Sequence, residues 1–67
     1  MENEIGNAAG IIWDYLNKNG ATPIAMLKRK TNLSTDLINR GIGWLAREGK
    51  LKFEVKDKDT VISLNIQ

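Results

Sequence analysis

The sequence predicts an α+β domain in which three helices precede a C-terminal β-hairpin. Up to Glu48, apolar residues recur at three- and four-residue steps, which is the spacing of amphipathic helices. After Gly49 they alternate with polar residues, as in strands with one buried face. We expect a single domain over residues 1–67, because a chain of 67 residues is too short to form two.

The first helix is predicted to run from Asn3 to Asn19 and to end at Gly20. One of its faces carries the expected core residues, which are Ile5, Ala8, Ala9, Ile12 and Leu16. A second apolar strip consists of Ala8, Ile11 and Tyr15. A short helix rarely carries two apolar faces unless both are covered, so we expect the strip to form a homodimer interface. The competing explanation is that the hairpin of the same chain covers it.

The second helix is predicted over Pro23–Lys30, with Thr22 as its N-cap and Pro23 as its first helical residue. A turn through Thr31-Asn32-Leu33 follows it. The stretch near Ala21 is a candidate for a short extended segment that adds to the hairpin.

The third helix is predicted to begin after Ser34, its N-cap, and to run to Glu48, before Gly49. Its inner face carries mainly apolar residues, which are Leu37, Ile38, Gly41, Ile42, Leu45 and the edge of Trp44. Its outer face is mainly polar and carries Asp36, Asn39, Arg40, Gly43 and Arg47. Because Gly41 faces inward, we interpret it as a site of tight helix packing.

The hairpin has two predicted strands that meet at a turn over residues 56–59. Its buried face would carry alternate apolar residues, which are Leu51, Phe53, Val55, Ile62, Leu64 and Ile66. The chain has no cysteine, so no disulfide can stabilise it. We therefore expect a core of aliphatic residues and the two tryptophans.

The charge of the chain is concentrated in its middle. The net charge is only +2, but residues 21–52 carry +5, whereas residues 1–20 carry −2 and residues 53–67 carry −1. A basic middle between acidic flanks suits a surface that faces phosphate on one side.

Composition argues against several other classes of protein. Without His or Cys there is no zinc-finger spacing, and the chain has no glycine-rich phosphate loop. We therefore expect no enzyme activity, no cofactor and no metal site. No apolar run approaches the roughly 20 residues of a membrane span, and no signal peptide is visible, so we expect a cytoplasmic protein without membrane contact.

The stretch Leu45-Ala46-Arg47-Glu48-Gly49-Lys50-Leu51 resembles the end of the recognition helix and the start of the wing in winged helix-turn-helix domains. The whole chain looks like a small stand-alone family of bacterial winged-helix proteins with little assigned function. The resemblance implies a three-helix winged helix-turn-helix with a C-terminal β-hairpin wing. It also implies DNA binding, although winged helices serve as protein–protein modules too.

The candidate DNA-binding residues fall into two groups. Asn39, Arg40 and Arg47 could read bases, since arginine pairs bidentately with guanine and asparagine with adenine. Residues that could contact phosphate are Lys28, Arg29, Lys30, Ser34, Lys50 and Lys52. Asp36 is interpreted as a residue that stabilises the helix N-terminus. The hairpin turn is locally neutral, so we interpret it as a solvated loop.

These observations predict a DNA-binding protein, a transcriptional regulator that uses residues 34–48 as its recognition helix. Double-stranded DNA is the expected partner, and the homodimer would form through the first helix. The alternative is a protein–protein interaction module that uses the same scaffold without nucleic acid.

Overall fold

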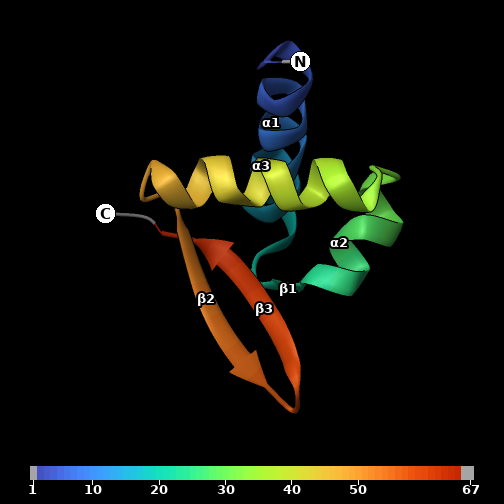
Figure 1. Ribbon diagram of the computed structural model, residues 1–67. Coiled ribbons are helices and arrows are strands. Elements are labelled where there is room, and N and C mark those ends of the chain that lie inside the picture. The colour runs from blue at the N-terminus through green and yellow to red at the C-terminus, as the bar shows by residue number, and fades with distance from the viewer. Residues whose placement is uncertain (1, 66–67) are drawn as a thin grey trace.

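The computed structural model describes residues 2–65, with side chains from Glu4 onward, and confirms the α+β class. The order of elements is α1 (Glu2–Asn19), β1 (Thr22–Pro23), α2 (Ile24–Thr31), α3 (Thr35–Arg47), β2 (Leu51–Lys56) and β3 (Asp59–Leu64). Figure 1 shows α3 crossing α1, with α2 at the N-terminal end of α3 and the β2–β3 hairpin extending away from the helices. The helices and the base of the hairpin enclose one core.

The crossing of α3 over α1 is close because residue 41 has no side chain. A Cβ atom at Gly41 would lie 2.8 Å from Ile12 Cδ1 and 3.2 Å from the backbone nitrogen of Ala9. This confirms the predicted packing role of Gly41. The core around this contact consists of buried aliphatic residues, which are Ala9, Ile12, Leu16, Leu27, Ile38, Ile42, Leu45, Leu51 and Ile62.

Local signals fix both ends of α3, which begins after Ser34 as predicted and ends at Arg47, one residue before the predicted Glu48. The Ser34 Oγ accepts a hydrogen bond from the Leu37 N–H at 3.1 Å, which satisfies one of the free amides of the first turn. At the other end Gly49 has a φ of 71°, and its N–H donates to the Ala46 carbonyl at 3.0 Å. A left-handed glycine at this position turns the chain out of the helix and into β2.

The predicted start of α2 is wrong by one residue, and Thr22 is not its N-cap. Thr22 and Pro23 form the short strand β1, in which Thr22 pairs with Ile62 and Pro23 with Val61. The buried Thr22 hydroxyl donates to the Gly20 carbonyl at 2.9 Å instead of accepting from the helix. Pairing with β3 therefore overrides the local capping signal, and the extended stretch expected near Ala21 is this strand.

The hairpin is confirmed, but only its base is buried. Strand β3 lies between β1 and β2, and the turn residues Asp57 and Lys58 both have positive φ, as a two-residue type I′ turn requires. Leu51 is buried, whereas Phe53 is 51% exposed and Val55 is 73% exposed. The prediction of a continuous buried face is wrong because the hairpin extends beyond the helices (Figure 1). Residue 66 lies outside the described residues.

The expectation that the tryptophans belong to the core is also wrong. Trp13 is 37% exposed and Trp44 is 45% exposed, so aliphatic residues alone form the buried cluster. Both tryptophans lie at the rim of the crossing between α1 and α3, where their rings contact solvent.

Two glycines of α3 should respond oppositely to the same substitution. Gly41→Ala should destabilise the fold by about 1–3 kcal/mol, because the new methyl group overpacks against the fully buried Ile12. Gly43→Ala should stabilise it by about 0.5–1 kcal/mol, because nothing lies within 4 Å and alanine favours the helix. Urea unfolding followed by circular dichroism measures both. Equal stabilisation of the two variants would show that the crossing has room for a side chain.

Candidate nucleic-acid interface

The outer face of α3 is exposed in the described part of the chain. Ile38, Ile42 and Leu45 hold the opposite face in the core, which leaves Asn39, Arg40, Gly43 and Arg47 exposed. A Cβ atom at Gly43 would meet nothing within 4 Å, so the helix backbone itself is accessible there. The three candidate base-reading residues thus lie on one accessible helix.

Arg40 has an intramolecular partner that the sequence analysis missed. Its Nε lies 3.0 Å from Asp36 Oδ2, and both side chains are largely exposed. The spacing of four residues on a helix is the sequence signal for such a pair. An exposed pair of this kind contributes only about 0.3–0.5 kcal/mol, so it can open when a stronger partner approaches. Asp36 therefore restrains Arg40 in addition to its role near the helix N-terminus.

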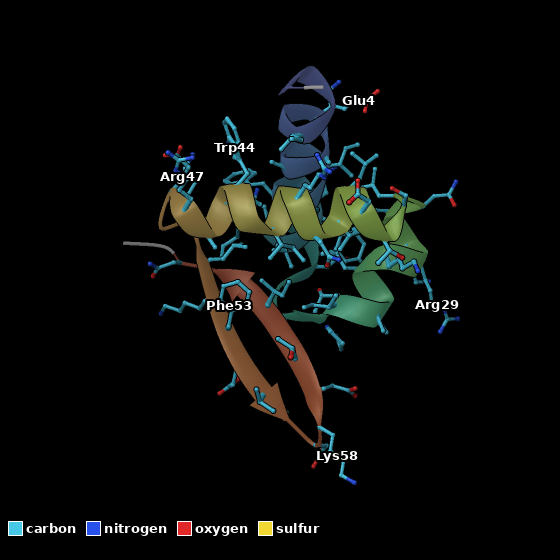
Figure 2. The ribbon with its side chains drawn as sticks, viewed as in Figure 1. Glu4, Arg29, Trp44, Arg47, Phe53 and Lys58 are labelled. Atoms are coloured by element: carbon cyan, nitrogen blue, oxygen red, sulfur yellow. The ribbon has the colours of Figure 1, made fainter. Side chains whose placement is uncertain are left out.

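Arg47 forms no ion pair with any carboxylate whose side chain the structure describes. Figure 2 shows Arg47 and Trp44 projecting from the same side of α3 near its C-terminal end. Arg47 is exposed, and its guanidinium group is available to a base or to a phosphate.

Cations flank α3 at both ends. Lys28, Arg29 and Lys30 form the last turn of α2, immediately before the loop that leads to Ser34. Lys50 and Lys52 follow the other end of α3, and all five cations are exposed. Because α3 has 13 residues, the two groups are separated by about 20 Å of helix. Positive charge therefore lies near both ends of the exposed helix.

Ser34 can contribute to the same surface. Its Oγ already accepts the Leu37 N–H, but its own proton remains available to a phosphate oxygen. It lies at the N-terminal end of α3, where the helix dipole favours an anion. The cap and the phosphate contact are therefore compatible.

The tip of the hairpin adds little positive potential. Lys56 pairs with Glu54 at 3.5 Å between Nζ and Oε2, and Lys58 lies between Asp57 and Asp59. Figure 2 shows Lys58 at the tip, far from α3. The cations that matter for an anionic partner are those that flank α3.

The strip predicted for a dimer interface is not continuous at the surface. Ala8 is buried, and its carbonyl carbon would lie 3.3 Å from a Cβ atom at Gly41, so α3 of the same chain covers this part of α1. Tyr15 is half-buried against the core, and Ile11 is exposed. The assignment of Ala8 to a dimer interface conflicts with this packing, because its side chain is inaccessible to a second copy.

The described residues offer neither a metal site nor a membrane-spanning helix. From Glu4 to Asn65, no group of three His, Cys, Asp or Glu side chains is placed to hold a metal ion. No helix among the described residues is long and apolar enough to cross a membrane.

Comparisons with known proteins agree with this architecture. Protein MJ1608 of Methanocaldococcus jannaschii is 35% identical over 66 residues, which cover 96% of this chain and 94% of that protein. The solution structure of BT2368 from Bacteroides thetaiotaomicron is 37% identical and superposes with a TM-score of 0.84, covering 96% of this chain and 79% of that one.

A more distant structure shares the fold. The Zalpha domain of PKZ from Carassius auratus, solved in complex with Z-DNA, is 20% identical with a TM-score of 0.77, covering 91% of this chain and 97% of that one. Residues 1–64 match the model of the family described as winged helix-turn-helix domain (DUF2582). The chain therefore belongs to this winged helix-turn-helix family.

Proposed function

We propose that the protein binds double-stranded DNA with α3 as its recognition helix, and that it acts in transcriptional regulation. The observation that carries the proposal is the arrangement of α3. Its outer face is exposed and polar, and exposed cations that pair with no described carboxylate flank it at both ends. In this arrangement the helix enters the major groove while the flanking cations contact the phosphates on either side.

The residues divide by role. Arg40 and Arg47 would donate to guanine O6 and N7, and Asn39 would pair with adenine. Gly43 lies between these side chains and lets the backbone approach the base edges, since no side chain projects there. The phosphate contacts would come from Lys28, Arg29, Lys30, Ser34, Lys50 and Lys52.

The Zalpha domain supports the nucleic-acid part of the proposal, because a protein with the same fold is seen in complex with Z-DNA. The proposed role in transcription would follow from DNA binding. A domain of this kind would act by occupying a DNA site and so changing the access of other proteins to it. A second copy placed over Ile11 would add a second recognition helix for an adjacent half-site.

Affinity for duplex DNA should fall steeply with salt. If the five flanking cations each neutralise one phosphate, log affinity against log salt should have a slope of about −4.5. Fluorescence anisotropy with a labelled random duplex measures this slope. Affinity that is independent of salt, or no binding at low salt, would favour the protein-interaction alternative.

Arg40→Ala should weaken duplex binding more than Lys58→Ala does. Loss of a specific arginine contact costs about 1–3 kcal/mol, whereas Lys58 lies at the neutral hairpin tip. The two variants remove the same charge, so the comparison separates position from charge. Equal losses in the anisotropy assay would mean that diffuse attraction, rather than docking of α3, accounts for binding.

Asp36→Asn should tighten duplex binding by about two- to fivefold, because it frees Arg40 and removes a carboxylate from the recognition helix. The same change should lower stability by up to about 1 kcal/mol through the lost ion pair and dipole interaction. Asp57→Asn is the matched control, since it removes an equal charge at the hairpin turn. If both variants tighten binding equally, net charge is the cause and the restraint on Arg40 is unimportant.

A further inference from the structure

A groove runs beside the proposed DNA-binding face, between α1, the C-terminal end of α3 and the start of β2. It consists of two hollows of about 310 and 430 Å³, and both are lined by Trp13 and Lys50. Trp44 lines the first hollow from the α3 side, and Gly10 lines it from the α1 side. The groove adjoins the outer face of α3 near Arg47, which borders both surfaces.

Both tryptophans of the chain line this groove, and among the described residues each keeps more than a third of its surface exposed. Tryptophan usually buries a large part of its surface, and neither ring belongs to the buried aliphatic cluster of this protein. Two glycines of α1, Gly6 and Gly10, also line the first hollow. A Cβ atom at Gly6 or Gly10 would meet nothing within 4 Å, so these glycines are not required by packing within the chain.

The charges around the two rings suggest what the groove binds. Lys50 lines both hollows, Arg47 projects on the same side of α3 as Trp44, and neither cation pairs with a carboxylate among the described side chains. Flat aromatic rings next to free cations match a ligand that combines planar bases with phosphates. Asp14 lines the first hollow without pairing with Lys50, so a phosphate backbone would lie on the lysine side.

We propose that this groove binds unpaired bases of single-stranded nucleic acid. The bases stack on Trp13 and Trp44, and Lys50 and Arg47 contact the adjoining phosphates. A nucleic-acid strand can pass along an open surface groove, whereas a small-molecule ligand is usually enclosed by its pocket. The open groove therefore favours a strand. The proposal adds a second activity to duplex recognition, and Arg47 and Lys50 would serve both surfaces.

Tryptophan fluorescence tests the proposal directly, because the only two tryptophans both line the site. We expect a single-stranded thymidine oligonucleotide of about eight residues to quench the emission with saturation. An abasic strand of equal length and charge should bind at least about fivefold more weakly, because it offers no base to stack. Equal binding of both strands would overturn the proposal, and so would the absence of any binding. Thymidine monophosphate that bound as tightly as the oligonucleotide would identify a nucleotide pocket instead of a strand site.

Two variants assign the effect to the groove. Trp44→Leu should weaken strand binding by about five- to a hundredfold, with duplex affinity changed by less than about twofold. Phe53→Leu is the matched control, because it removes an equally exposed ring from the hairpin, outside both hollows. Equal losses in the two variants would contradict a specific site.

Gly10→Gln provides a test that does not depend on losing a large side chain. It should stabilise α1, since glutamine favours a helix and a Cβ atom there is unopposed, while its side chain fills the groove and weakens strand binding. A variant that is more stable and binds single strands as well as the wild type would overturn the proposal. Circular dichroism and the fluorescence titration give the two readouts.

Discussion

The contact at Gly41 is the constraint on which the rest of the structure depends. With no side chain at this position, α3 lies against the backbone of α1 near Ala9, and Ile12 fills the space beside it. This close packing of α3 on α1 directs the side chains of Ile38 and Leu45 into the core, so the opposite face of α3 points outward. The same crossing brings the rim tryptophans together, so both proposed binding surfaces arise from one close helix contact.

The distribution of charge then distinguishes the surface around α3 from the hairpin tip. Basic residues gather at its two ends and leave its outer face accessible, while the hairpin tip stays neutral through alternating charges and the pair of Lys56 with Glu54. Within the outer face, Asp36 holds Arg40 through an exposed ion pair, which is weak enough to exchange for a base or a phosphate. In the proposed complex, the intramolecular pair would lower attraction for DNA of any sequence, and a well-placed guanine would compensate for its loss.

The sequence predicted the features that depend on local signals and missed those that depend on tertiary placement. Both ends of α3 were found because Ser34 and Gly49 act on their own neighbours. Thr22 was misassigned because its pairing with β3 involves residues forty positions away. Alternation placed Phe53 on one face of the hairpin but could not tell how far the helices cover that face. Among the candidate site residues, periodicity placed Ala8 on a second strip, although the crossing with α3 buries it.

The central claim is that the outer face of α3 binds duplex DNA, and amide chemical-shift mapping during a titration with a random duplex tests it most directly. We expect the largest shifts at Asn39, Arg40, Gly43 and Arg47, with smaller shifts in residues 28–30 and 50–52. Shifts confined to the exposed part of α1 around Ile11, or no shifts at low salt, would contradict the account.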